Sequence, residues 1–204
     1  MSLTQAEHIF GGAHETGIND LIQAFFTARP RYLRFGTPLF VPATTVAETS
    51  VSPITFFGLN INFLIFARPI PTVDITPGGA GSGPLMPGTN EFTLRTTLNF
   101  TVAINNFPQI TGSLQVLALC APFVAVSNPG SGQIGITLKR IEIVDITPDP
   151  IESIIEGLAL GVLQTMLGTL HLPFNTLTAG AFGLILLAGP TAETNQIKVR
   201  GNAL

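Results

Sequence analysis

Hydrophobic residues near the start of the chain recur with the spacing of an α-helix. Five of them follow one another at intervals of three, one, three and one residues, which places all of them on one side of a helix. They are Ile18, Leu21, Ile22, Phe25 and Phe26. Thr16 is placed to cap the start of this helix, and Pro30 ends it. The pattern therefore predicts an amphipathic helix over about 16–29 that covers another part of the protein.

From about residue 38 to about 147 the hydrophobic period changes to the alternation that is typical of β-strands. In the clearest segment, 92–105, apolar side chains alternate with Thr, Asn and Arg. Further strands are predicted at 54–66, 114–126 and 133–146. In the last of these the apolar positions change parity across Lys139 and Arg140, which indicates a β-bulge or a sharp bend. Strands of this length favour a strongly curved antiparallel sheet.

A second helix is predicted at about 150–170. Asp149 as N-cap, Pro150 at the first helical position and Glu152 as the partner in a capping box define its start. The apolar residues of this helix cover more than half of its circumference. We therefore expect other elements to surround it on more than one side.

Three glycines share the remaining narrow face of this helix, and they are Gly157, Gly161 and Gly168. Because glycine inside a helix costs about 1 kcal/mol, we expect another backbone or a ligand to approach there. Two short strands are predicted within about 181–200. Together these elements predict an α+β fold in which a long, strongly curved antiparallel sheet wraps a long apolar C-terminal helix. With the amphipathic N-terminal helix, they are expected to form a single domain over residues 1–204.

Composition narrows the class of protein. Only 10% of the residues are charged, against 46% that are hydrophobic, and the formal net charge is −3. Soluble domains carry roughly 25% charged residues. The composition excludes intrinsic disorder, which needs lower hydrophobicity and a higher net charge. It also excludes a coiled coil, which needs more Glu and Lys. No basic run is present, so we expect no nucleic-acid partner.

The chain shows no targeting or membrane segment. Its first residues have neither the basic nor the apolar region of a signal peptide. The longest apolar stretches, Gly157 to Leu172 and Ala179 to Gly189, are shorter than the roughly 20 residues that cross a membrane. We expect a soluble protein without a transmembrane segment that is cytoplasmic or exported by a non-classical route.

No motif points to catalysis. The sequence Gly130 to Gly135 matches Gly-x-Gly-x-x-Gly but leads into a strand, whereas dinucleotide binding needs it to open a helix. His8, His14 and Glu15 lack a fourth metal ligand. Cys120 lies in an apolar run that predicts a buried thiol. We expect no enzyme, no cofactor and no metal.

One basic cluster stands out, formed by Arg29, Arg31 and Arg34 after the first helix. Two interpretations remain open for it. The cluster either lies in solvent at the end of the helix or contacts a phosphate or a lipid head group.

The chain holds 15 Phe and one Tyr, so its large aromatic side chains add apolar area without polar groups. A site lined by them selects apolar, flexible ligands. In the layout of its predicted elements the chain resembles the tubular lipid-binding (TULIP) superfamily. The resemblance lies in the helix at Ile18–Phe26, the strands at 54–66 and 92–105 and the helix Ile151–Leu170. That superfamily includes bactericidal/permeability-increasing protein-like domains and bacterial toxin-cluster proteins of the OrfX type.

The resemblance implies a lipid-like ligand in a groove between the long helix and the sheet. By this analogy eight residues lie near the ligand, and they are Phe57, Ile61, Phe63, Phe100, Val102, Leu158, Val162 and Met166. The leading hypothesis is therefore non-enzymatic binding of a hydrophobic or lipid-like molecule. The alternative is a structural component, such as a coat, shell or toxin-complex subunit. Its low-charge surface would bind further copies of the chain or a protein partner.

Overall fold

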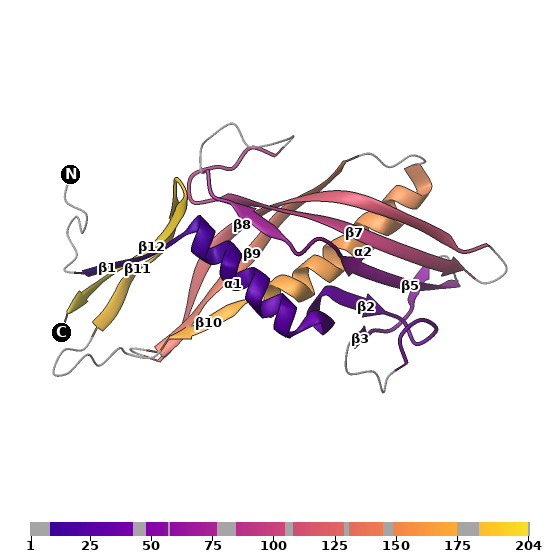
Figure 1. Ribbon diagram of the computed structural model, residues 1–204, viewed down its shortest axis with the longest axis horizontal. Coiled ribbons are helices and arrows are strands. Elements are labelled where there is room, and N and C mark those ends of the chain that lie inside the picture. Colours follow the sequence, from indigo (N-terminus) through magenta and orange to yellow (C-terminus); the bar gives the residue numbers. More distant parts are fainter. Residues whose placement is uncertain are drawn as a thin grey trace.

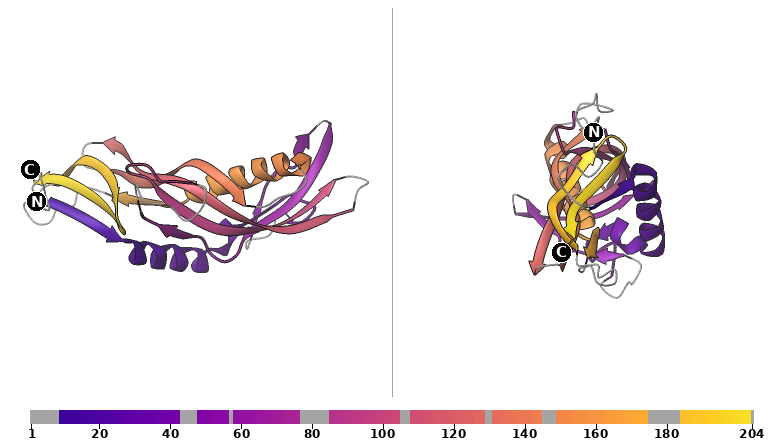
Figure 2. Two further views of the ribbon diagram at one scale, coloured as in Figure 1. Left: turned by 90° about the horizontal axis from the view of Figure 1, so that it is seen from above. Right: turned by 90° about the vertical axis from the view of Figure 1, so that its left-hand side faces the viewer.

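The computed structural model describes residues 9–42, 48–56, 58–76, 85–104, 108–128, 131–144, 149–174 and 184–203. Within these residues the protein is mostly β, with two α-helices and one short 3-10 helix (Figure 1). The molecule is elongated, and its large antiparallel-rich sheet curls along the long axis (Figure 2). The predicted α+β class fits this architecture.

The large sheet has nine strands in the described part of the chain. Its order is β10-β9-β8-β7-β5-β2-β3, with β4 paired to β5 and β6 paired to β7. All its pairs are antiparallel except β2 with β3. The strands are β2 (Arg34–Gly36), β3 (Thr49–Ser50), β4 (Ile54–Phe56), β5 (Leu59–Ala67), β6 (Thr72–Asp74), β7 (Phe92–Ile104), β8 (Ile110–Asn128), β9 (Ser131–Val144) and β10 (His171–Phe174).

A small sheet occupies one end of the molecule (Figure 1). It consists of β1 (Ile9–His14), β12 (Gln196–Ala203) and β11 (Leu184–Glu193), in the antiparallel order β1-β12-β11. The closing strands are thus present, but they form a second sheet with β1. Periodicity did not predict β1, because the pair Gly11-Gly12 interrupts any apolar alternation.

Helix α1 (Glu15–Ala28) begins one residue earlier than predicted, and the predicted cap is wrong. The N-cap is His14, whose Nδ1 accepts a hydrogen bond from the backbone N–H of Thr16 at 3.2 Å. The physical reason is that β1 leads directly into the helix and leaves His14 extended, with its ring beside the first turn. The 3-10 helix η1 (Pro30–Leu33) follows α1.

Helix α2 (Asp149–Gly168) packs one side against the sheet. Its buried residues are Ile155, Leu158, Ala159, Val162, Leu163, Met166 and Leu167. The opposite side is exposed and carries Glu156, Leu160 and Gln164. The side chains of the predicted capping box lie outside those that the structure describes.

No backbone among the described residues approaches the α2 glycines, and the approach of a ligand there stays a prediction. A Cβ atom built at Gly157, Gly161 or Gly168 meets no described atom within 4 Å. These positions face open space because the sheet covers only one half of the helix.

Alternate residues of β5, β7, β8 and β9 form the inner face of the large sheet, which packs against α1 and α2 in one core cluster. In register across β5 and β7, Ile61 lies opposite Ile104, and Phe63 opposite Val102. Ile65 lies opposite Phe100 in the same face. This regular pairing keeps the apolar sides of neighbouring strands together.

The single strand predicted at 54–66 is wrong, because the chain reverses within it. β4 pairs antiparallel with β5, so that Phe56 lies opposite Leu59. Gly58, at a φ of 77°, supplies the left-handed conformation that this tight turn requires. The alternation continues on both sides of the turn, which is why periodicity alone did not reveal the reversal.

The predicted bulge in β9 is confirmed. Leu119 of β8 pairs with Arg140, whereas the next residue, Cys120, pairs with Leu138. Lys139 is therefore the extra residue of the bulged strand. The bulge keeps apolar residues on the inner face on both sides of it.

Candidate functional site

The residues predicted to contact a ligand lie in the main core, apart from Phe57, which lies outside the described residues. The other seven are between 0% and 8% exposed, and they are Ile61, Phe63, Phe100, Val102, Leu158, Val162 and Met166. The structure brings them together in one cluster. Their role as ligand contacts stays a prediction.

A cavity of about 400 Å³ lies elsewhere, between α1, the small sheet and the inner face of β8 and β9. Helix α1 contributes Gly17, Ile18, Leu21, Ile22 and Phe25. The small sheet contributes Gly11, Gly12, Ala13, Ile197 and Val199. The large sheet contributes Pro122, Ile134, Gly135 and Ile136, and the segment after α2 contributes Thr169 and Leu170. None of the predicted ligand contacts is among them.

The lining of this cavity is apolar. Thr169 carries the one polar side chain among the lining residues, and its Oγ1 donates to the carbonyl of Met166 at 2.6 Å. No lining residue has an ionisable side chain. Such a lining can hold a molecule by shape and by the exclusion of water, because it donates no side-chain hydrogen bond.

Residues Gly17 and Leu21 show why this wall of the cavity is open. A Cβ atom at Gly17 would meet nothing within 4 Å. Leu21 belongs to the predicted apolar stripe of α1, yet it is 48% exposed, whereas Ile22 and Phe26 are buried. Within the stripe, Phe26 therefore fills the core, Leu21 lines the cavity, and Ile22 belongs to both.

Two polar side chains fix α1 along the free edge of β6. Asn19 Nδ2 donates to the carbonyl of Val73 at 3.0 Å, and Asn19 Oδ1 accepts from the N–H of Val73 at 2.8 Å. Glu15 Oε2 accepts from the N–H of Ile75 at 2.7 Å. Residues four apart in a helix are about 6 Å apart along its axis, and residues two apart in a strand are about 6.7 Å apart. The two spacings match, so the helix satisfies the strand edge.

The turn between β11 and β12 is fixed to the same place. The N–H of Asn195 donates to the carbonyl of Ile75 at 2.7 Å, and the N–H of Glu15 donates to the carbonyl of Asn195 at 2.8 Å. Asn195 has a φ of 61°, which asparagine tolerates in tight turns. The small sheet and α1, two walls of the cavity, are therefore both hydrogen-bonded to Ile75, the residue that follows β6.

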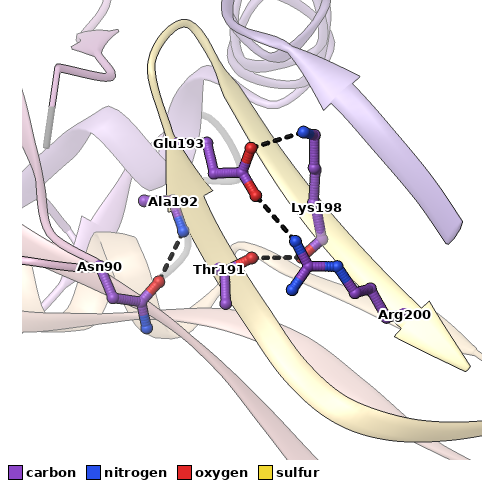
Figure 3. A network of polar contacts seen from close by, with 6 residues as sticks. All are labelled: Asn90, Thr191, Ala192, Glu193, Lys198 and Arg200. Atoms are coloured by element: carbon purple, nitrogen blue, oxygen red, sulfur yellow. Dashed lines mark hydrogen bonds and ion pairs between the residues drawn. The ribbon is translucent and has the colours of Figure 1, made fainter. Parts of the chain in front are cut away.

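A second contact ties β11 to the segment before β7. Asn90 Oδ1 accepts a hydrogen bond from the N–H of Ala192 (Figure 3). On the same hairpin Glu193 pairs with Lys198 and, at 3.0 Å, with Arg200. Lys198 and Arg200 alternate along β12 with the cavity-lining Ile197 and Val199, so these charges lie on the other face of the small sheet.

Other chemistry is limited in the part of the chain that the structure describes. No group of three or more His, Cys, Asp or Glu side chains is placed to hold a metal ion there. Cys120 is fully buried, as predicted, and burial raises the pKa of its thiol to about 12. Neither described helix is long and apolar enough to cross a bilayer.

Sequence reasoning missed the cavity because its walls come from five separate segments. The signals that were available are the adjacent glycines of β1 and Gly17 on the apolar side of α1. Both mark backbone without side-chain volume. Their meaning depends on β1 being a strand, which periodicity did not predict.

No protein-family model matches the chain, and no curated protein matches it. Among solved structures, the chain is similar to a lipopolysaccharide binding protein, with 11% sequence identity and a TM-score of 0.32. The similarity covers 97% of this chain and 50% of that protein. The chain therefore spans about half the length of the solved structure.

Proposed function

We propose that this chain binds an apolar or lipid-like molecule, without catalysing a reaction, in the cavity between α1, the small sheet and the inner face of β8 and β9. The observation that carries the proposal is the lining, in which Thr169 has the one polar side chain and donates its hydroxyl proton to the carbonyl of Met166. Such a wall gives no binding energy to a polar molecule, which would lose its hydration on entry. It favours hydrocarbon, whose transfer from water contributes about 25 cal/mol per Å² buried. The lining offers no nucleophile or general base, which supports a binding role.

The size of the cavity limits the ligand. Its volume of about 400 Å³ falls within the range of small-molecule sites, roughly 300–1,000 Å³. A group as large as a water molecule occupies roughly 30 Å³, and a methylene is of similar size, so the cavity holds about 13 such groups. A single hydrocarbon chain fits this space.

Two measurements test the proposal. Organic extraction of the natively purified protein, followed by mass spectrometry, is expected to release an apolar or amphiphilic molecule. Titration calorimetry with 1-decanol is expected to give one binding site per chain. A folded protein that releases no such molecule and does not bind 1-decanol would overturn the proposal.

Glycine substitutions locate the site. Gly17→Leu places a side chain on the cavity wall, so we expect it to lower the affinity for 1-decanol at least about tenfold, or about 1.4 kcal/mol. The matched control is Gly161→Leu on α2, where a side chain also meets open space but no cavity. Equal affinities for the two variants would place the ligand elsewhere.

The alternative from the sequence, a self-associating component, stays a prediction. Light scattering over a range of concentrations tests it.

A further inference from the structure

We propose that the ligand of this cavity is a single hydrocarbon chain ending in an anionic group, and that Arg29 and Arg31 bind that group. This inference rests on the proposed function, because the chain must occupy the apolar cavity. It adds the chemistry of the polar end, which the lining itself does not bind. It also assigns a role to two members of the basic cluster.

Arg29 lies on a ring that lines the cavity, and Arg31 lies on the ring stacked against it. Phe25 of α1 lines the cavity, and Arg29 Cζ lies 5.6 Å from the centroid of its ring. The ring of Tyr32 stacks on Phe25, with centroids 5.8 Å apart and planes 12° apart. Arg31 Cζ lies 4.9 Å from the Tyr32 ring, and Arg31 Nη2 donates to the Tyr32 hydroxyl at 3.3 Å. An aromatic pair therefore carries both cations, and one ring of this pair, Phe25, lines the cavity.

The charges of this cluster are not equivalent. Arg34 is paired with Glu48, with Nη2 and Oε1 2.6 Å apart. Among the described residues, no carboxylate forms an ion pair with Arg29 or Arg31, and both side chains are exposed. Two cations are thus available to a ligand, and the third is already neutralised.

The carboxylates of α1 do not compete for these cations. Glu15 accepts a hydrogen bond from Ile75 at the other end of the helix. Asp20 lies five residues before Phe25, which places it about 140° around the helix from that ring. The charged groups on the Phe25 and Tyr32 rings are therefore both cations, in a protein whose formal net charge is −3.

Arginine suits this role better than lysine, whose ammonium group acts as a point charge. Its planar guanidinium donates two parallel hydrogen bonds to a carboxylate or phosphate, and its flat face remains attractive to an aromatic ring. Stacking on Phe25 and Tyr32 limits the conformations of both side chains before binding. The hydrocarbon chain is then held by desolvation, and its charged end stays at the surface.

Four ligands, each with an unbranched ten-carbon chain, separate the two parts of the proposal. Titration calorimetry at low ionic strength compares decanoate, decyl phosphate, 1-decanol and decyltrimethylammonium. We expect both anions to bind more tightly than 1-decanol, and the cation to bind more weakly. In about 1 M salt, where the Debye length is about 3 Å, the difference is expected to shrink. The order of the two anions identifies the preferred head group.

The decisive variant is Arg29→Gln with Arg31→Gln. We expect it to lower the affinity for decanoate and decyl phosphate about five- to tenfold, because each exposed ion pair contributes a factor of about two to five. The affinity for 1-decanol is expected to stay unchanged. The matched control, Lys139→Gln with Arg140→Gln, removes the same charge from exposed residues of β9 and is expected to change neither. Circular dichroism confirms that the variants fold.

The outcomes are distinguishable. If 1-decanol binds and the anions bind no more tightly, or if both double variants behave alike, this inference is overturned while the proposed function stands. If the folded protein binds none of the four ligands, the proposed function fails and this inference with it. Tighter binding of decyltrimethylammonium also overturns the inference.

Discussion

Asn19 uses both ends of its amide to bind one residue that lies 54 positions away, donating to the carbonyl of Val73 and accepting from its N–H. This contact completes the hydrogen bonding of the β6 edge, which would otherwise be open to water or to another chain. It also sets where α1, and with it the Phe25 and Leu21 wall of the cavity, lies on the large sheet. The shape of the apolar cavity thus depends on a polar contact that lies outside it.

Removing this contact is expected to destabilise the protein. Asn19→Ala leaves a partly buried donor and acceptor of Val73 without partners, so we expect the free energy of unfolding in urea to fall by about 1–3 kcal/mol. The control is Gln23→Ala on the same helix, where the exposed bond to Thr27 is 3.5 Å long. That change should cost less than about 0.5 kcal/mol. Equal losses in both variants would contradict the edge contact.

The ring of Phe100 packs over Gly112 in the neighbouring strand. A Cβ at residue 112 would lie 2.7 Å from Phe100 Cζ, so Gly112→Ala is expected to cost about 1–3 kcal/mol as the buried ring shifts. The matched change Gly157→Ala, where the Cβ faces open space, is expected to raise stability by up to about 1 kcal/mol. Thermal unfolding of the two variants checks the opposite signs. A stabilising Gly112→Ala would contradict the packing of the ring.

Cys120 is expected to be unreactive in the folded protein. Desolvation by burial raises the pKa of its thiol from 9.0 to about 12, and only the thiolate reacts. At about pH 8 iodoacetamide should modify the unfolded chain and leave the native protein unmodified, which mass spectrometry measures. Rapid labelling of the native protein would show that the thiol is accessible.

The same shift makes stability depend on alkaline pH. Because the folded pKa is raised, the contribution of Cys120 is fully present below about pH 9 and is lost as the pH rises toward 12. The loss is about 1.4 kcal/mol per pH unit in that window. Cys120→Ala should flatten this part of the stability profile. An unchanged profile would contradict the burial of an ionisable thiol.

Met166 tests whether a ligand lies between α2 and the sheet. The side chain is fully buried, so Met166→Ala is expected to lower stability by about 2–5 kcal/mol. It does not line the cavity, and we expect the affinity for 1-decanol to change less than about twofold. If the affinity falls as far as in Gly17→Leu, the ligand occupies the groove implied by the family resemblance instead.

Prediction from the sequence was most accurate where residues that are close in the chain decide the structure. The alternation at 92–105 predicted β7, and the parity change at Lys139 predicted the bulge in β9. It failed where a single residue redirects the chain, as at Gly58, and where a helix cap comes from the preceding strand, as at His14. The curled sheet with two helices fits the α+β class that periodicity predicted. Membership of the TULIP superfamily stays a prediction.

The sequence by itself determined which faces of the helices and strands are apolar, because periodicity is a local property of the chain. Only the tertiary structure decided which of these faces fill the core and which line a cavity. Whether an apolar face fills the core or lines the cavity depends on where α1 and the small sheet lie. Hydrogen bonds of Glu15, Asn19 and Asn195 fix both of them against β6 and the residue after it. Those contacts join residues 54 or more positions apart. No local pattern encodes them, so Leu21 reads as a core residue until the fold places it beside open space.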